Sequence, residues 1–460
     1  MMVKFYSTSG YNAIRDSNFI VLPSESTLYT YMVPKRESGV SQLRLGELAS
    51  VAKSLPSNHR EVSIVFDEMA LQPNLNFDSS GFMTGFATNK SNDSLQLATS
   101  MLCFMIQGLK KNFHEVVSFH PVHNLDAEFL EKCFLQVVNL VMKAGFCPRL
   151  GVCDNHSTNR KMYRSISGKT DEELMTDPVI VNPYNTDEKI ILIHDPVHIL
   201  KCLRNNWFRK PEWLLSTGNS ISWNLLQVLL EHEQEMPIRK AHSLTTKAVK
   251  PNNFDKQKVK LAYNVFSWPV RNALIFYSQS HPEMFPKYQV DGTTQFMDAS
   301  REFFEILNIN HVKKGPISSV DSPKLIKLNE IRDYFSALNK SGIFTKETFL
   351  ALQQTISGTL KVIELLLESD PGRVKVFTAR FQQDPIEEHF GHQRLYSGCS
   401  YRVTPLQFSQ TERKLTNLST LNTNSTSSTS RERKRPLEWN DAPFLSISLL
   451  QVTFKKRYYV

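Results

Sequence analysis

The chain has 460 residues, of which 41% are hydrophobic and 22% are charged, so a collagen-like, disordered or disulfide-framed chain is excluded and two or three globular domains fit. No stretch approaches 18 consecutive apolar residues, so we predict no membrane-spanning segment and no membrane partner. The net charge of +9 favours a polyanionic partner, nucleic acid above all. A basic enzyme that never meets nucleic acid would carry the same charge.

The cysteines indicate an intracellular protein. None of the six forms a CxxC pair, and apolar neighbours predict reduced core residues instead of a disulfide frame or zinc knuckle.

The N-terminus has no hydrophobic signal-peptide region. Residues 431–436, RERKRP, resemble a nuclear-import patch and predict a nuclear protein, although a solvated run of charge would read the same.

Residues 1–57 are predicted to form a helical module. Residues 11–20 have apolar side chains at helical spacing, and a second segment runs through residues 28–32. Between them, Leu22, Pro23 and Ser24 form a helix-breaking and capping cluster. The module could contact DNA, mediate dimerisation, or simply pack on the next domain.

Residues 61–166 predict the order β-β-β-α-β-α. We expect strands over 61–67, 81–88, 96–107 and 148–153. Residues 127–144 have the 3.6-residue periodicity of a buried helix, which Gly145 should end. A further helix should follow the last strand, with Ser157 or Thr158 as its cap.

Two of these strands end at an acid. Asp67 follows the apolar run of the first strand, and Asp154 follows the strand 148–153. Carboxylates held at the tips of neighbouring buried strands can form a two-metal site, because Mg²⁺ prefers hard oxygen ligands. The simpler alternatives are that Asp67 only starts a turn and that Asp154 forms an Asx-turn or a helix cap.

Residues 170–370 are predicted to be mostly helical with polar loops, one of them at 185–189. The segment 194–206, HDPVHILKCLRNN, places Asp195, His198 and Lys201 at intervals of three after Pro196 as first helical residue. This side of the helix could bind phosphate, or it could be a solvated basic face. No GxxxxGK[ST] or GxGxxG sequence is present, which excludes a standard P-loop or dinucleotide motif.

The C-terminal third contains a third acid of interest. Helices are expected over 294–308 and 349–367, and an extended segment at 377–381. In the sequence 383–394, QDPIEEHFGHQR, a helix-capping role explains Asp384 and Pro385 fully but explains Glu387 only weakly. Residues 416–460 lose periodicity, so we predict a low-complexity basic tail in which the segment LNTNSTSSTS is disordered.

Taken together, these motifs resemble the P element transposase family, which includes the THAP-domain transposases. The resemblance runs from about residue 5 to about residue 415 and depends on the order and combination of the motifs. They are FDEM at 66–69, CDNHSTN at 153–159, HDPVHILKCLRNN at 194–206, FFEILN at 303–308, QDPIEEHFGHQR at 383–394 and TPLQF at 404–408.

The resemblance implies an α/β fold: an RNase H-like catalytic domain interrupted by a large, mainly α-helical insertion that binds GTP. Glu387 follows Asp154 by 233 positions, too many for a loop in a compact domain, which independently favours an insertion. The expected segments are a helical module at 1–57, catalytic parts at 58–169 and 371–415, the insertion at 170–370, and the tail at 416–460.

The resemblance also implies the site residues. Asp67, Asp154 and Glu387 match the family's DDE triad, which holds two Mg²⁺ ions. The GTP site matches Asp195, Lys201, Glu305 and Asp384, with Lys201 at the phosphates and the acids Glu305 and Asp384 at the guanine N–H edge. The family has Asp where this chain has Glu305, so the reach of that side chain differs.

The leading hypothesis is a transposase, or a transposase-derived protein, that cleaves and transfers DNA strands. Its expected partners are transposon ends, target DNA and GTP as an assembly cofactor, and we expect a homo-oligomer. The family's N-terminal zinc-coordinating finger has no counterpart here, which compromises recognition of transposon ends unless the chain is a fragment, a mispredicted gene or a domesticated copy. The alternatives are a catalytically inactive DNA- or protein-binding factor, or a GTP-binding regulator.

Overall fold

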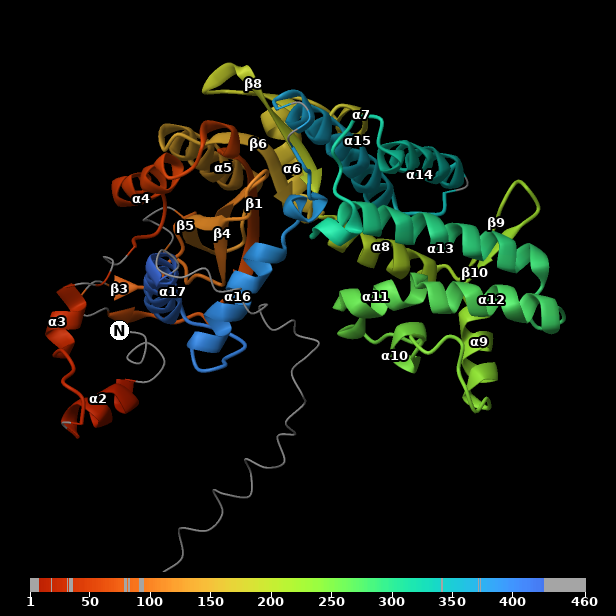
Figure 1. The fold of residues 1–460 in the computed structure, drawn as a ribbon, viewed down its shortest axis with the longest axis horizontal. Helices are drawn as coiled ribbons and strands as arrows, with labels where there is room; N and C mark the ends of the chain where they lie inside the picture. Colours follow the sequence, from red (N-terminus) through yellow and green to blue (C-terminus); the bar gives the residue numbers. More distant parts are fainter. Residues whose placement is uncertain are drawn as a thin grey trace, which may run out of the picture. The chain divides into compact units, whose positions relative to one another are not determined.

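The structure is a computed structural model that describes residues 8–17, 19–30, 32, 36–77, 81, 83–90, 95–340, 342–370, 372 and 374–425 (Figure 1). The chain divides into two compact units, Met1–Pro34 with Arg413–Val460, and Lys35–Glu412. All seven predicted site residues lie in the unit Lys35–Glu412. The predicted nuclear-import patch and most of the predicted tail lie outside the described residues.

A mixed sheet forms the centre of the unit Lys35–Glu412. Within the described residues, its six strands have the order β5-β4-β1-β6-β8-β7. Their bounds are β1 Glu61–Ala70, β4 Ser100–Gly108, β5 His114–Val122, β6 Cys147–Cys153, β7 Val179–Asn182 and β8 Asn185–His194. Strands β1, β6 and β8 are parallel neighbours, and the other pairs are antiparallel. The carboxyl ends of β1, β6 and β8 therefore meet at one edge of the sheet.

Helices cover one face of this sheet. They are α4 Gln42–Lys53, α5 Ala127–Lys143 and α6 Ser157–Ser167 (Figure 1). The even-numbered residues of β1, such as Ile64 and Phe66, face them and share a buried cluster with Leu130 and Phe134 of α5. The apolar stripe of α5 thus covers the sheet as its periodicity predicts, and Gly145 follows the helix with a positive φ of 94°.

The opposite face is covered by α15 (Lys346–Glu368) and α16 (Asp384–Tyr396). Helix α15 lies against β8, where Thr355 Oγ1 donates to the carbonyl of His194 over 2.9 Å and accepts from its N–H over 3.1 Å. Gln354 donates to the Leu192 carbonyl over 3.0 Å. These side-chain hydrogen bonds hold the C-terminal end of β8 against α15.

A helical region follows β8 in sequence and encloses its own core, which includes the fully buried side chains of Trp207, Trp213 and Trp223 (Figure 1). Indole rings pack there edge-to-face, with 4.9 Å between the ring centres of Trp207 and Trp223. The elements of this region are α8 Pro196–Arg209, β9 Glu212–Leu214, β10 Ser220–Ser222, α9 Asn224–Gln234, α10 Thr246–Val249, α11 Val259–Phe266, α12 Trp268–Ser280, α13 Lys287–Leu307 and α14 Pro323–Asn339.

The unit Met1–Pro34 with Arg413–Val460 contains α2 (Thr8–Asp16) and α3 (Glu25–Thr30), and α17 runs over Pro405–Ser425. The first helix begins and ends earlier than the predicted 11–20. The predicted break is confirmed: the Tyr11 hydroxyl donates to the Pro23 carbonyl over 2.7 Å, and Ser24 Oγ accepts from the N–H of Thr27. The predicted disorder of LNTNSTSSTS is wrong for its first five residues, because α17 continues to Ser425.

Four strand predictions need correction. Strand β1 continues to Ala70 because its antiparallel pairing with β4 runs on to Ser100, so Asp67 lies within the strand. Among the described residues of the predicted strand 81–88, only Met83–Thr84 form a strand, β3, which pairs with β2 (Asn76–Phe77) in a separate two-stranded sheet. Strand β5 was not predicted, and β7 and β8 lie in a segment predicted as helical insertion, because their turn is polar. Within the described residues, no helix is both long and apolar enough to cross a bilayer.

Two local predictions at chain turns also differ. Residues Thr378–Phe381 form a 3₁₀ turn where an extended segment was expected. The cap of α6 is His156, whose side chain accepts from the N–H of Thr158, so Ser157 and Thr158 already lie inside the helix. Further along, the start of α8 follows the prediction, with Pro196 as its first residue.

Candidate active site

Three aspartates lie where the parallel pairing of β1, β6 and β8 ends. Asp154 directly follows β6, Asp195 directly follows β8, and Asp67 stands two residues beyond Val65, the last β1 residue paired with β6. The Asp195 N–H donates to the Cys153 carbonyl over 2.8 Å, which ties the two strand ends together. The parallel register of these strands therefore brings acids from distant parts of the sequence to one place.

The charges of neighbouring acids and the burial of Asp67 both affect its pKa. Its Oδ1 accepts from the Glu68 N–H over 2.8 Å. Burial raises the pKa of Asp67 from 3.8 to about 7, and repulsion from Asp154 and, more weakly, Glu387 adds to the rise. The negative charges of Asp154 and Glu387 therefore both act on Asp67.

Asp154 is held in a turn. Its Oδ1 accepts from the His156 N–H over 2.9 Å and from Asn159 Nδ2 over 2.6 Å. The Asx-turn reading of Asp154 is thus confirmed, and it is compatible with a ligand role because the turn fixes the carboxylate at the strand end.

Glu387 reaches the site from α16. This helix begins at Asp384, and the cap position belongs to Gln383, whose side chain makes no capping bond, so the predicted cap Asp384 is one residue late. In the first turn, Glu387 Oε1 lies 3.2 Å from His198 Nε2. This hydrogen bond and the charges of His198 and Lys201 lower the pKa of Glu387 against the opposing effect of burial.

His198 was predicted to lie on a basic side of this helix but was not predicted as a site residue. Burial lowers the pKa of His198, but the hydrogen bond to Glu387 and the charge of Asp195 outweigh it and raise the pKa overall. The signal was its position: it stands three residues after the helix cap Asp195, whose Oδ2 accepts the His198 N–H over 2.9 Å. The first turn of α8 therefore aims this imidazole at the acids.

The solvated-face reading of α8 is wrong. Lys201 is only 8% exposed, and Arg204 is fully buried. The Arg204 guanidinium donates hydrogen bonds to the carbonyls of Asp255 and Lys256. Lys201 lies close enough to the acids to lower the pKa of Asp384 and of Glu387. Lys201 is thus a partly neutralising cation beside the carboxylates.

The other residues predicted for GTP are divided between two places. Asp195 is 1% exposed, and its two carboxylate oxygens accept from the main-chain N–H groups of His198 and Gln383. Asp384 is exposed at the surface. Its pKa is nevertheless raised to about 7, mainly because surrounding protein desolvates the carboxylate and secondly because Asp195 and Glu387 repel it. Both lie beside the metal-ligand candidates.

Glu305 lies apart, on α13. Its Oε1 accepts from the Tyr263 hydroxyl over 3.0 Å and lies 3.9 Å from Arg301 Nε. The structure therefore brings Asp195, Lys201 and Asp384 together, and places Glu305 among side chains of the helical region.

The donor chemistry of the acid site fits Mg²⁺, but its present geometry is not a finished site. Across the described ranges, no group of three or more His, Cys, Asp or Glu side chains is arranged to hold a metal ion. Asp67, Asp154 and Glu387 supply hard oxygen ligands and unbalanced negative charge. Glu387, with 45% of its side chain exposed, is the one that can turn most freely.

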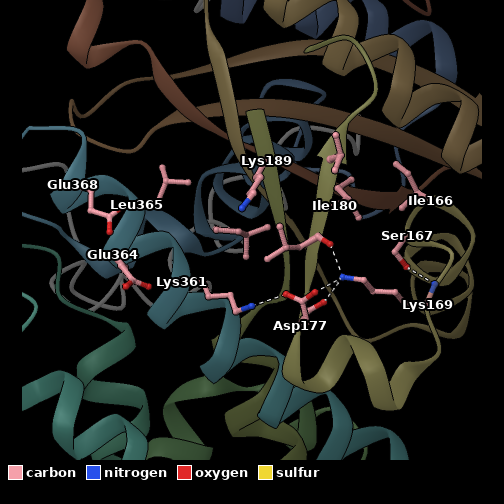
Figure 2. A pocket seen from close by; sticks show the side chains of 13 residues that line it. Ile166, Ser167, Lys169, Asp177, Ile180, Lys189, Lys361, Glu364, Leu365 and Glu368 are labelled. Atoms are coloured by element: carbon pink, nitrogen blue, oxygen red, sulfur yellow. Dashed lines mark hydrogen bonds and ion pairs between the residues drawn. The ribbon is translucent and has the colours of Figure 1, made fainter. Parts of the chain in front are cut away.

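A cavity of about 780 Å³ lies elsewhere, and none of the predicted site residues lines it (Figure 2). Lys169 and Lys361 both point at Asp177, with 2.6 Å and 2.5 Å between the charged atoms. Lys169 also donates to the Val179 carbonyl over 2.8 Å, on the strand β7 that borders the sheet. These contacts serve to tie the sheet edge to α15.

Comparison with known proteins decides the relationship. Residues 36–167 match the TNP-like, RNase H N-terminal domain, and residues 197–318 match the TNP-like, GTP-binding insertion domain. The Transposable element P transposase of Drosophila melanogaster is 24% identical over 418 residues, which cover 88% of this chain. The predicted resemblance to P element transposases is confirmed.

The same comparisons show how much of each chain the similarity covers. The chain spans about half the length of the curated P transposase, since 51% of that protein is covered. A structure of the Drosophila P element transposase strand transfer complex superposes with a TM-score of 0.72 over 90% of this chain and 89% of that chain. At 21% identity this match shows the fold: an RNase H-like α/β domain with a GTP-binding insertion domain, as predicted.

Proposed function

We propose that this chain is a DNA transposase, or derives from one, and that it cleaves DNA strands and transfers them with the help of Mg²⁺. What supports the proposal is that the parallel strands β1 and β6 bring Asp67 and Asp154 to one edge of the sheet, and that the charges of Asp154 and of Glu387 on α16 both act on Asp67. Repulsion between carboxylates destabilises the folded protein. Acids placed against this cost therefore indicate a site that binds a cation or a substrate.

Each acid has a distinct part in this proposal. Asp67 and Asp154 are fixed by the strand and by the Asx-turn, so they form the rigid half of the ligand set. Glu387 completes it by turning its exposed carboxylate from His198 toward the two aspartates. When bound, Mg²⁺ supplies stabilisation of the attacking and leaving oxygens of a phosphoryl transfer. The nucleophiles are water in cleavage and a DNA 3′-hydroxyl in strand transfer.

DNA binding in this proposal depends on the excess of basic residues, which contact phosphates without reading sequence. Transposon ends and target DNA are the proposed substrates. A homo-oligomeric assembly and a nuclear location stay predictions of the sequence.

Asp154→Asn tests the proposal directly. The asparagine keeps an acceptor for His156 and Asn159 but removes the charge that binds cations, so Mg²⁺-dependent nicking of DNA should fall at least about a hundredfold. The assay is cleavage of a supercoiled plasmid with transposon ends in Mg²⁺ and in EDTA. Unchanged Mg²⁺-dependent nicking by the variant would remove the assignment of the acids.

A second candidate is a DNA- or protein-binding factor without catalysis. The observation that favours it is that the described residues contain no metal group ready to bind as they stand. This candidate predicts DNA retention in a binding assay together with equal, background nicking by the wild-type chain and by Asp154→Asn.

We further propose GTP as an assembly cofactor and not as a fuel. The match of residues 197–318 to a GTP-binding insertion domain supports the ligand. Lys201 is proposed for the phosphates, and Glu305 and Asp384 as acceptors for the guanine N–H edge. Asp195 would act by holding the start of α16, because its two oxygens are already occupied by main-chain donors.

Lys201→Ala is expected to weaken GTP binding by about 10- to 100-fold, because a charge-assisted hydrogen bond contributes about 1.5–3 kcal/mol. The measurement is calorimetric titration of the full chain with GTP. Lys189→Ala, which removes an exposed lysine lining the cavity of Figure 2, is the matched control and should bind like wild type. Equal affinity of the Lys201 variant would exclude Lys201 from the GTP site.

A further inference from the structure

Gln383 lies where the three acid-bearing segments meet, and no step of the proposed reaction uses it. Its side chain is 1% exposed, and it occupies the position directly before α16. The Gln383 side chain makes no capping hydrogen bond to α16, so its burial at this position must be explained by other contacts.

The first contact of Gln383 is with the strand that carries Asp67. Its Nε2 donates to the Phe66 carbonyl over 2.8 Å. The parallel ladder between β1 and β6 ends one residue earlier, at Val65 and Val152, so this carbonyl lies just past the end of the ladder. A buried carbonyl without a donor costs about 1–3 kcal/mol, and the Gln383 amide supplies that donor next to the first metal-ligand candidate.

Two further contacts join Gln383 to the remaining segments. Its main-chain N–H donates to Asp195 Oδ1 over 3.2 Å, at the start of α8. Its carbonyl accepts from the Glu387 N–H over 3.1 Å, within the first turn of α16. One residue therefore contacts the neighbour of Asp67, the cap of α8 and the main chain of Glu387.

We propose that Gln383 is a positioning residue, whose side-chain amide sets the distance and rotation of α16 relative to β1 and so fixes Glu387 against Asp67. This inference rests on the proposed metal-dependent nuclease function. Gln383 touches neither metal nor DNA in it and acts only through Phe66 and Glu387. An error of about 1 Å in the placement of a ligand can cost about a hundredfold in rate, so such a contact has consequences for catalysis.

The preceding residue offers a matched control. Gln382 is fully buried too, and its Nε2 donates to the Leu307 carbonyl over 2.7 Å, at the end of α13 and away from β1. In both glutamines the Oε1 atom is buried without a hydrogen-bond partner. Gln382→Met and Gln383→Met therefore remove the same kind of bond from the same turn, but only the second affects the strand of Asp67.

The test measures Mn²⁺ binding to the full chain by electron paramagnetic resonance, together with thermal unfolding and the kcat and KM of DNA nicking. Both methionine variants should lose similar thermal stability. Gln383→Met alone should weaken Mn²⁺ binding and lower kcat by about 10- to 100-fold with KM unchanged, as expected for a residue that orients a metal ligand.

The outcomes separate this inference from the proposed function. If the wild-type chain binds no Mn²⁺, or if Asp154→Asn binds it equally well, the proposed function fails and the inference with it. If Asp154→Asn abolishes binding while Gln383→Met binds like Gln382→Met, only the positioning role is overturned. Equal kcat losses in both methionine variants would also overturn it, because they would indicate a general loss of structure.

Discussion

Replacing Asp67 by asparagine should abolish cleavage and stabilise the folded protein at the same time. The variant removes a rigidly held carboxylate from the proposed ligand set, so Mg²⁺-dependent nicking should fall by about a thousandfold or more. Burial and the charges of Asp154 and Glu387 make the ionised form of Asp67 costly, and asparagine removes that cost while its side-chain oxygen can still accept from the Glu68 N–H. Opposite effects on activity and stability mark a residue kept for function.

The stability gain should depend on pH. The folded pKa of Asp67, about 7, lies above its ordinary value of 3.8, so the folded state binds the proton more tightly than the unfolded state. The destabilising effect of Asp67 is therefore absent below about pH 4, grows as the pH rises to 7, and is complete above it. Asp67→Asn should accordingly gain nothing at pH 4 and about 1–4 kcal/mol of unfolding free energy at pH 8.

Urea unfolding in EDTA at both pH values measures this gain, and Asp177→Asn is the matched control. Hydrogen bonds from Lys169 and Lys361 outweigh burial and lower the pKa of Asp177, which is half-exposed. Its replacement should therefore destabilise the fold slightly, by about 0.5–1 kcal/mol at pH 8, and leave nicking unchanged. A loss of stability in Asp67→Asn at pH 8 would show that Asp67 is not repelled by its neighbours.

The sequence predicts the RNase H-like α/β fold with its insertion, but it misses strands of the sheet that carries the acids. The charges of Asp154 and Glu387 both raise the pKa of Asp67, as expected if the three acids belong to one site. Their assignment as metal ligands stays a prediction, since within the described part of the chain no finished metal group is present. The end of β6 could be predicted because the four residues before Asp154, from Leu150 to Cys153, are apolar and all buried.

The missed elements share a physical cause. The first half of β8 is polar because it pairs with β7 at the border of the sheet and faces solvent, so it resembles a loop in sequence. Lys201 and Arg204 resemble a solvated face because nothing local shows that distant segments bury them. Contacts that cover an element from far along the chain leave no trace in its own periodicity.

A substitution of Gly358 should be among the most destabilising single changes in the chain. A Cβ built on this residue of α15 would lie 2.4 Å from Cγ2 of Ile193 and 3.1 Å from Cγ2 of Ile191, both on β8. The absence of a side chain therefore lets α15 approach β8 closely enough for Thr355 to bond the main chain of His194. Gly358→Val should push the helix away, strain the packing and loosen those bonds, at about 3 kcal/mol or more.

Gly391 of α16 provides the opposite case, because a Cβ there meets no atom within 4 Å. Both glycines lie inside helices, where alanine is intrinsically favoured by about 1 kcal/mol. Gly391→Ala should thus raise the free energy of unfolding by about 0.5–1 kcal/mol, whereas Gly358→Ala should lower it by about 1–2 kcal/mol, because its steric clash exceeds the helical gain. Chemical denaturation of the four chains, with valine at 358 as the extreme, measures these signs. If alanine stabilises the protein equally at both positions, the close contact between α15 and β8 does not exist, and the support it gives to the strand end before Asp195 is lost.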